Sequence, residues 1–250
     1  MFQSDTDGEW EKFGKDDPYF GVVTDEKFRT ANLTPANREE FFASGFAYMD
    51  GVIANVRRYI DPAFTIGKAL DFGCGVGRLV IPLAQRARQV TGVDVSDSML
   101  KEAAKNCEAR ALGNVVLVKS DDALSRLNGE YDFIHSFIVF QHIPAARGER
   151  IFEMLLSRLA RGGVGVLHFK YGRDASSRRL VSFVKRTIPF ASNFINLFKG
   201  REFLAPQIEM NAYDLNRLFL SLQKSGVRDC HTAFTDHEGE AGIVVYFRKA

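Results

Sequence analysis

Short apolar runs alternate along the chain with segments whose apolar residues recur at helical spacing. The runs are bounded by turn residues and are too short to be helices, so they predict buried strands. They lie at 69–72, 90–95, 115–118, 131–140 and 164–169, and two more follow at 227–235 and 243–248. Amphipathic segments between them, such as 151–160, predict helices that cover a sheet. This alternation predicts an α/β protein.

The N-terminal region has a different pattern. Residues 1–17 are polar and charged and predict a loose or partly ordered arm. The Asp-Pro step at the start of 17–21 predicts a turn, with Tyr19 and Phe20 exposed on it. This region lacks the apolar periodicity of the rest of the chain.

A helical pattern begins at Thr34, which has the character of an N-cap and is followed by Pro35. Amphipathic segments continue to an Asp-Pro step at 61–62, where we expect the helical region to end. The chain therefore divides into an N-terminal arm and helical cap over 1–62 and a main domain over 63–250.

The stretch 69–79 carries the strongest chemical signal. An apolar run leads into Asp71, three glycines follow at alternate positions, and a helical pattern starts after the last of them, Gly77. Glycine permits positive φ and close approach of a ligand to the backbone. The unpaired N–H groups of the first helical turn point into the same space. The stretch predicts a strand, a tight turn and a helix that together bind a ligand.

A second acidic residue strengthens this interpretation. Asp94 ends the next apolar run, 21 residues after Gly73. In nucleoside-binding α/β folds an acid at this place accepts hydrogen bonds from ribose hydroxyls. The alternative is a capping role for Asp94 at the helix that begins near Ser96. The ordered series of strand, turn, helix, strand and acid favours the nucleoside site.

With these motifs the sequence resembles the class I S-adenosylmethionine-dependent methyltransferases. The resemblance covers about residues 50–170 well and the last part of the chain loosely. The matching stretches are 70–78, 92–100, 119–122, 131–136, 140–144 and 159–163. It implies a doubly wound, mostly parallel, seven-stranded Rossmann-like sheet whose last strand is antiparallel. It also implies S-adenosylmethionine as cofactor and S-adenosylhomocysteine as product.

The resemblance further implies which residues meet the cofactor. Asp94, beside the glycine turn, would accept hydrogen bonds from the ribose hydroxyls of the cofactor. An acid after the third strand would accept from the adenine amino group, and the end of the fourth strand would lie near the sulfonium. The expected cofactor-binding residues are Asp71, Gly73, Cys74, Gly75, Asp94, Val95, Met99, Asp121, Asp122, Ser136 and Phe137. For the acidic pair, Asp121 is expected to use its side chain and Asp122 its backbone N–H, with a solvated acidic turn as the alternative.

The expected catalytic residue is His142. It follows the fourth strand at the edge of the sheet where ligands of open α/β folds bind. A neutral histidine there can take a proton from an acceptor hydroxyl as its oxygen attacks the methyl group. The alternative is a packing or capping role in the loop. His168, near the end of the fifth strand, is the second candidate, although a satisfied core histidine is the commoner situation.

Residues expected to contact the methyl acceptor are assigned by position only. In related methyltransferases helices before the first strand lie over the cofactor, so Tyr19 and Arg29 are candidates for its methionine end, with aromatic packing and a surface arginine as the alternatives. The expected substrate-binding residues are Tyr19, Gln141, Tyr171, Asn211 and Tyr213, and Met210 is expected to line the same pocket. Asn211 is also expected to cap the helix that follows it.

Residues 172–206 depart from the minimal fold. Basic residues outnumber acids there and are interspersed with apolar ones, which predicts a basic, amphipathic helical insertion. It could be a lid over the acceptor site, a homodimer contact or a helix on the surface of an anionic membrane. A lid or dimer contact is favoured.

Composition and charge bear on the expected partners, metal sites and location of the protein. The 250 residues are 46% hydrophobic and 26% charged, as in an ordinary globular protein. The net charge of +2 gives no argument for a nucleic-acid partner. Three separated cysteines indicate neither a disulfide framework nor a zinc site, and no Asp/His cluster indicates another metal. No signal peptide or apolar span is present, so the expected location is the cytoplasm.

The sequence therefore favours a methyltransferase acting at oxygen of a small molecule or saccharide. It lacks the Asn-Pro-Pro-Tyr-like motif of amino-group methylation after the fourth strand. A cofactor-binding scaffold without catalysis is the alternative. A nicotinamide-dependent oxidoreductase is less favoured, because its Gly-x-Gly-x-x-Gly pattern would need glycine where Arg78 stands.

Overall fold

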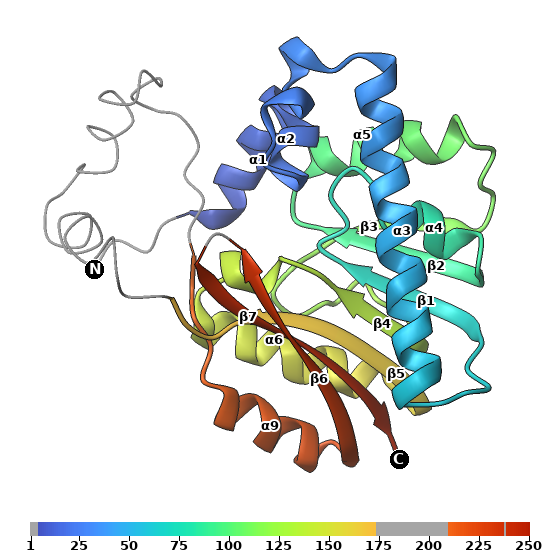
Figure 1. Cartoon of the computed structure of the whole chain (residues 1–250), viewed down its shortest axis with the longest axis vertical. Helices are drawn as coiled ribbons and strands as arrows, with labels where there is room; N and C mark the ends of the chain where they lie inside the picture. The colour runs from blue at the N-terminus through green and yellow to red at the C-terminus, as the bar shows by residue number, and fades with distance from the viewer. Residues whose placement is uncertain (1–4, 174–209, 238) are drawn as a thin grey trace, which may run out of the picture.

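A computed structural model describes residues 5–173, 210–237 and 239–250. Seven strands form one sheet in the order β3-β2-β1-β4-β5-β7-β6 (Figure 1). The bounds are β1 Ile66–Phe72, β2 Ala87–Asp94, β3 Val115–Lys119, β4 Tyr131–Ser136, β5 Leu159–Lys170, β6 Val227–His237 and β7 Glu240–Lys249. The first five are parallel to one another, and β7 runs antiparallel to both of its neighbours. The predicted seven-stranded methyltransferase-like sheet is confirmed.

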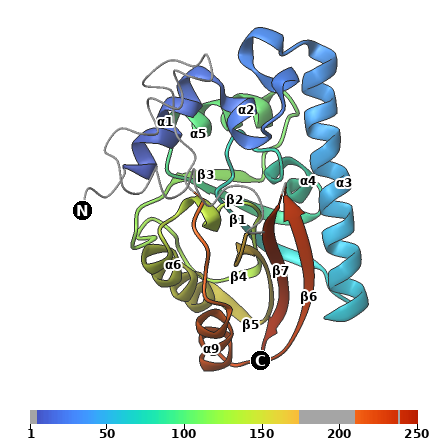
Figure 2. The same cartoon turned by 60° about the vertical axis from the view of Figure 1, so that its left-hand side comes forward.

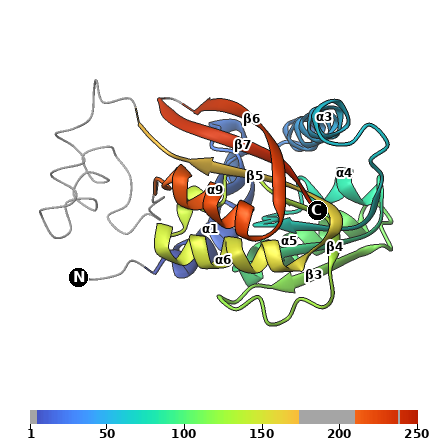
Figure 3. The same cartoon turned by 90° about the horizontal axis from the view of Figure 1, so that it is seen from below.

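Side-chain alternation along the strands builds two cores, one on each face of the sheet. Ala69 and Phe133 face one core, whereas their neighbours Leu70 and Ile134 face the other. The first core is closed by α3 (Pro35–Tyr59) and α4 (Val80–Ala84), and the second by α6 (Ala145–Arg158) and α9 (Leu215–Lys224). Figure 3 shows α3 and α6 on opposite sides of the sheet.

The N-terminal region is more ordered than its sequence predicts. Residues expected to form a loose arm are the helix α1 (Thr6–Asp16), whose first turn is capped by the Asp5 side chain. The expected turn is the short helix α2 (Pro18–Val22), and the expectation that Tyr19 and Phe20 are exposed is wrong, because both rings are buried. Their burial is tertiary: Tyr19 packs edge-on against Phe41 of α3. Sequence periodicity cannot detect a short helix held by such distant contacts.

Helix α3 begins as predicted, with the Thr34 hydroxyl accepting from the Asn37 N–H and Pro35 in the first turn. It is one continuous helix rather than separate segments. Its buried face shares a core with β1 and β4. The division of the chain near residue 62 stays a prediction.

Two further boundaries differ from expectation. The helix α6 ends at Arg158 and the chain enters β5 at Leu159, so the end of the segment 151–160 that was expected to be helical lies within a strand. Asp214, and not Asn211, caps α9 by accepting from the Asn216 N–H. The predicted insertion at 172–206 lies almost wholly outside the described residues.

One helix and three 3-10 turns complete the frame around the strand ends. The helix α5 (Asp97–Glu108) follows β2 and is capped by Ser96, as predicted. The 3-10 turns η1 (Glu26–Phe28) and η2 (Thr30–Asn32) join α2 to α3, and η3 (Phe140–His142) follows β4. Figure 2 shows α1, α2 and α5 together at one end of the sheet.

Candidate active site

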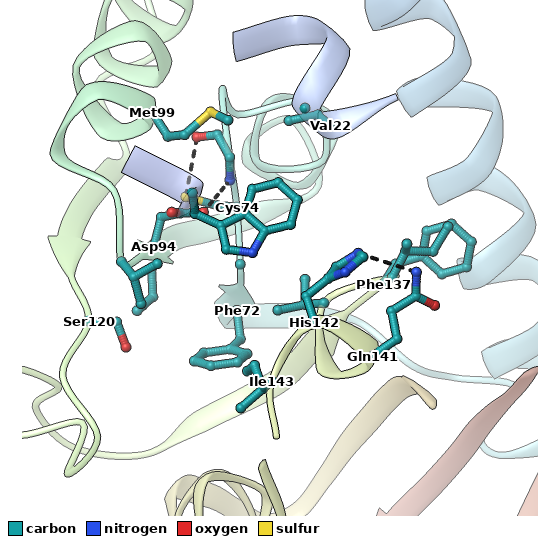
Figure 4. A pocket seen from close by; sticks show the side chains of 18 of the residues that line it. Val22, Phe72, Cys74, Asp94, Met99, Ser120, Phe137, Gln141, His142 and Ile143 are labelled. Carbon is teal, nitrogen blue, oxygen red and sulfur yellow. Dashed lines mark hydrogen bonds between the residues drawn. The ribbon is translucent and has the colours of Figure 1, made fainter. Parts of the chain in front are cut away.

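A cavity of about 630 Å³ lies where β1, β2 and β4 end. Its floor is formed by the glycine turn and the segments that follow β2 and β4, and its roof by α1 and α2. This is the edge at which open α/β sheets bind ligands. Figure 4 shows Asp94 and Met99 on one side of the cavity and Gln141 and His142 on another.

The glycine turn is fixed to β2 by two backbone bonds. The N–H groups of Gly73 and Cys74 both donate to the Val93 carbonyl, at 2.8 and 2.9 Å. Gly73 has φ +76°, and a Cβ there would lie 2.3 Å from Val139. Only glycine permits this conformation and this contact together. The turn therefore presents bare backbone to the cavity, and Gly73, Cys74 and Gly75 all line it.

Asp94 joins the turn to the next helix. Its carboxylate accepts from the Gly75 N–H at 2.8 Å and from the Ser96 N–H at 2.9 Å. It is half-buried and lines the cavity. Burial raises the pKa of Asp94 to about 6, against the opposing effect of these N–H donors. The nucleoside and capping interpretations are thus compatible, because the same carboxylate bridges two backbone segments and faces the cavity.

The other predicted residues beyond β2 and β3 separate into two groups. Val95, Met99 and Asp121 line the cavity. Asp122 does not, and its side chain pairs with Arg147. The Asp121 carboxylate is occupied in its own turn, where it accepts from the N–H groups of Ala123 and Ser125. An adenine contact through Asp121 would have to share those acceptors.

The end of β4 also separates the predicted residues. Phe137 lines the cavity. Ser136 is buried and lies outside it, because its hydroxyl donates to the Phe72 carbonyl at 2.9 Å. Asp71 lines the cavity at the end of β1 and accepts from His135 Nδ1 at 2.8 Å. A strand-end position alone does not tell which side chains face a ligand.

His142 lies in η3 and lines the cavity. The Gln141 amide nitrogen is 3.2 Å from His142 Nε2, and the Trp10 ring packs edge-on at a centroid distance of 5.0 Å. An amide nitrogen only donates, so in the neutral ring this contact assigns the lone pair to Nε2 and the proton to Nδ1. In that tautomer Nε2 is the nitrogen that can accept a proton.

His168 does not share this setting. It is buried outside the cavity, with its Nε2 2.9 Å from the Thr235 hydroxyl and its Nδ1 without a partner among the described residues. Burial, together with the nearby His237 and His142, lowers the pKa of His168 to about 3. The geometry favours His142 over His168 as a proton acceptor.

Of the residues expected at the acceptor pocket, Gln141 and Met210 line the cavity and the others lie outside it. The Tyr19 hydroxyl contacts Glu102 and Asn106 of α5, and Arg29 pairs with acidic residues on the surface. The Tyr213 hydroxyl donates to the Phe140 and Ile143 carbonyls. Tyr213 therefore supports the loop that carries His142 and does not reach the ligand itself. Tyr171 packs near Phe234, and the Asn211 N–H donates to the Gln141 carbonyl.

Several cavity residues were not predicted from the sequence. They come from α1, α3, the turn before α4, α6 and β6: Trp10, Ser44, Arg78, Arg147 and His237. The one available signal was Trp10, the only tryptophan of the chain, in an otherwise polar segment. A large aromatic ring in such a segment indicates packing, which would have favoured a helix docked on the main domain.

Helix α1 is fastened to the floor at both sides of the cavity. Arg147 of α6 donates to both carboxylate oxygens of Asp7 at 2.8 and 2.7 Å and also contacts Asp122. Hydrogen bonds and ion pairs with these two acids raise the pKa of Arg147 above its usual range. On the other side Glu11 accepts from the hydroxyls of Ser96 and Ser98. The roof therefore rests on charged and polar contacts.

Metal-ligand clusters and membrane-spanning helices are both missing from the described residues. No group of three or more metal-ligating side chains lies close enough together in this part of the chain to hold a metal ion. Across the same residues, every helix is too short or too polar to cross a bilayer.

Comparison with known proteins agrees with the geometry. Residues 69–163 match a methyltransferase domain family. Over 88 residues the chain is 39% identical to a magnesium-protoporphyrin O-methyltransferase of Synechocystis, covering 35% of this chain and 38% of that protein. A trans-aconitate 2-methyltransferase of Deinococcus radiodurans is 31% identical over 123 residues, 48% of this chain and 45% of that protein. The chain thus spans less than half the length of these curated relatives.

Solved structures extend the likeness to the whole fold. The magnesium protoporphyrin IX methyltransferase of Synechocystis, crystallised with S-adenosylhomocysteine, matches with a TM-score of 0.63 and 21% identity over 97% of both chains. The N-methyltransferase NodS of Bradyrhizobium japonicum, also bound to S-adenosylhomocysteine, matches at 0.59 with 12% identity over 98% of this chain and 99% of that one. At these identities the likeness shows the fold. The chain therefore carries a methyltransferase domain match over residues 69–163 and has the fold of these S-adenosylmethionine-dependent methyltransferases.

Proposed function

We propose that the protein transfers the methyl group of S-adenosylmethionine to an oxygen of a small-molecule acceptor. One observation carries this proposal: a single cavity joins a nucleoside-type site, made by the glycine turn and Asp94, to a histidine held in its proton-accepting tautomer. Its volume of about 630 Å³ lies in the range of small-molecule sites.

The cofactor end would be held by the floor. Asp94 would accept from ribose hydroxyls, the backbone of Gly73 to Gly75 would pass close to the ligand, and Met99 would pack on the base. Val95, Asp121 and Phe137 line the same cavity and stay proposed cofactor contacts. Ser136 and Asp122 would act indirectly, through the Phe72 carbonyl and through Arg147.

The reaction would need only alignment and removal of one proton. When bound, the cofactor supplies a methyl group that is already activated at sulfur. His142 Nε2 would take the acceptor proton as the oxygen–methyl bond forms and the sulfur–methyl bond breaks. The Gln141 amide, which donates to His142 Nε2 in this structure, would have to move away so that the acceptor hydroxyl can donate to the same nitrogen. Alignment within the closed cavity supplies the rest of the rate enhancement.

The acceptor class follows from the lining near His142. Trp10, Phe137, Ile143 and Met210 make that part of the cavity mostly apolar, which favours a small molecule with an apolar body over a saccharide. The family match alone does not select the acceptor. A tRNA/tmRNA (uracil-C(5))-methyltransferase of Campylobacter curvus shares 35% identity over 66 residues, 26% of this chain and 18% of that protein.

The first experiment is calorimetric titration of the purified protein with S-adenosylmethionine, S-adenosylhomocysteine and NADH. Micromolar binding of the first two and none of the third supports the proposal and justifies an acceptor screen by mass spectrometry. NADH binding alone would contradict it. Binding of the methionine compounds with no methylated product from any hydroxyl-bearing acceptor would favour a cofactor-binding scaffold.

A further inference from the structure

The element that carries His142 is a single turn. In η3 the His142 N–H donates to the Val139 carbonyl at 2.9 Å. The Ile143 N–H donates to the Phe140 carbonyl at the same distance. The hydrogen bonds of a 3-10 turn have poorer geometry than those of an α-helix, so one such turn is weakly held by itself. The position of the His142 ring therefore depends on the contacts that the turn receives from other segments.

The Tyr213 hydroxyl holds the turn at both ends. It donates to the Phe140 carbonyl at 2.8 Å and to the Ile143 carbonyl at 2.9 Å, sharing one proton between them. Burial raises the pKa of Tyr213 above its usual range, so the hydroxyl keeps that proton. The bond to Phe140 is buried, where a carbonyl left without a donor would be costly. Loss of this one oxygen atom would release the turn at both ends.

Helix α6 has a glycine at the place where this hydroxyl lies. A Cβ on Gly148 would lie 1.9 Å from Tyr213 Oη. Gly148 is buried in α6, which begins shortly after the turn. Glycine is unfavourable inside a helix, and the contact gives a packing reason for it at this position. A side chain at Gly148 would push the hydroxyl away from the turn.

The rest of the segment 210–213 joins the turn to β5. The Asn211 N–H donates to the Gln141 carbonyl at 2.6 Å. At the end of β5 the Lys170 carbonyl accepts from the Tyr213 N–H at 2.8 Å. The buried Lys170 ammonium donates to the Met210 carbonyl at 3.3 Å. The turn is thus tied to a central strand through this segment.

The tautomer of His142 depends on the same turn. The Gln141 amide donates to His142 Nε2 at 3.2 Å, as Figure 4 shows, and this contact favours the proton on Nδ1. Both side chains project from η3, so the contact persists only while the turn keeps its shape. A general base also needs its accepting nitrogen aimed at the acceptor, and small displacements of such a group are costly in rate.

We propose that Tyr213 is a positioning residue for His142. Its hydroxyl fixes η3, and the turn in turn presents Nε2 of the ring to the methyl acceptor. This inference rests on the proposed function, because His142 is the proposed base. Tyr213 lies outside the cavity and acts through the turn.

The test observes the His142 ring directly and needs no acceptor. The chain has five histidines, so nitrogen NMR of protein with isotope-labelled histidine can resolve each ring, and His142→Gln identifies the signals of His142. The spectra are taken at a pH at which that ring is neutral. We expect a single tautomer in the wild type, with the proton on Nδ1. In Tyr213→Phe the two nitrogen signals should move toward each other, because the released ring exchanges between both tautomers.

Two further variants sharpen the test. Tyr246→Phe is the matched control, because Tyr246 is also buried and its hydroxyl accepts from the Asn55 amide, on β7 and outside the cavity. It should leave the His142 signals unchanged. Gly148→Ala displaces the Tyr213 hydroxyl from the α6 side and should reproduce the mixed tautomers. It should change the signals less in Tyr213→Phe, where that hydroxyl is already absent.

Affinity separates a local effect from a general one. S-adenosylhomocysteine should bind Tyr213→Phe within about twofold of the wild type by calorimetry, since Tyr213 does not line the cavity. Melting curves establish that each variant is folded. If Tyr213→Phe does not fold, the signals of Gly148→Ala decide the question.

Each outcome has one meaning. Mixed tautomers in Tyr213→Phe, with the wild-type pattern in Tyr246→Phe, support the inference. An unchanged single tautomer in Tyr213→Phe overturns it, as do mixed tautomers in the wild type or in both tyrosine variants. Failure of the wild type to bind S-adenosylhomocysteine contradicts the proposed function, and that result is independent of the histidine signals.

Discussion

The floor and the roof of the cavity are built in different ways. The floor belongs to residues 69–163, the part that matches the methyltransferase domain family, and its key contacts join neighbouring segments, such as Asp94 to Ser96. The roof belongs to α1 and α2, outside the match, and reaches the floor through contacts far apart in sequence, such as Asp7 to Arg147. The floor thus lies within the matched domain, and the roof is held by contacts made from outside that match.

His142 lies where the two regions meet, and its substitution should have the largest effect. His142→Gln removes the proton acceptor but keeps a polar side chain beside Trp10. We expect turnover to fall by about 10²- to 10⁴-fold, the usual contribution of general-base catalysis. The affinity for S-adenosylhomocysteine should stay within about twofold, since the base acts on the acceptor. Initial rates and calorimetry measure the two effects.

The control for this prediction is His231→Gln. That histidine stacks on Tyr59, far along the sheet from the cavity. Its substitution should leave turnover and affinity unchanged. Full turnover in His142→Gln would remove the catalytic role and leave His142 as a packing residue of the roof contact.

Asp94 tests the floor alone. Asp94→Ala removes a carboxylate that binds two backbone N–H groups and faces the cavity. We expect cofactor affinity to fall by about 10- to 100-fold, from the loss of charged hydrogen bonds to ligand hydroxyls. Asp97→Asn, at the exposed start of α5, is the matched control and should bind normally. Equal affinity in Asp94→Ala would limit Asp94 to capping.

The same contrast explains how much the sequence could predict. The strands, the glycine turn and the Ser96 cap follow from local patterns, and the sheet that results places Asp94 and His142 at one edge. Local patterns do not tell which way a side chain points at a strand end. Ser136 is an example, because it stands at a strand end and yet its hydroxyl donates to the Phe72 carbonyl and does not face the cavity.

The roof could not be predicted, because its stability is tertiary. α1 has polar and charged residues on most of its surface, and the structure shows them used in contacts with α5 and α6. The Tyr19 ring packs against Phe41, and its hydroxyl makes a hydrogen bond to α5. Neither contact can be predicted from the residues next to Tyr19 in the sequence. Arg78 follows the recognised motif, yet its contacts with Ser44 and Tyr48 of α3 become visible only when the residues around it are placed.

A smaller effect is expected from pH, which should change cofactor affinity through Asp94 of the floor. Asp94 must be ionised to accept from ligand hydroxyls, and burial raises the pKa of Asp94 to about 6 in the free protein. Affinity should therefore be full above that pH and fall as the pH drops through it, by about tenfold at pH 5, where only about one molecule in ten carries the carboxylate. Asp94→Asn should bind more weakly but without this dependence. A wild-type profile that is flat between pH 7 and 5 would contradict the assignment.

The smallest effect is expected for the roof. Arg147→Met removes the guanidinium that holds Asp7 and Asp122, while Glu11 still fastens α1 on its other side. Because partly exposed ion pairs contribute about 1 kcal/mol, we expect the dissociation rate of S-adenosylhomocysteine to rise by about fivefold. The fluorescence of Trp10, the only tryptophan, reports the event directly, since its ring lines the cavity. Arg150→Met, an exposed arginine of the same helix, is the control. An unchanged dissociation rate in Arg147→Met would mean that α1 does not limit ligand exit, and the roof would then act on the acceptor alone.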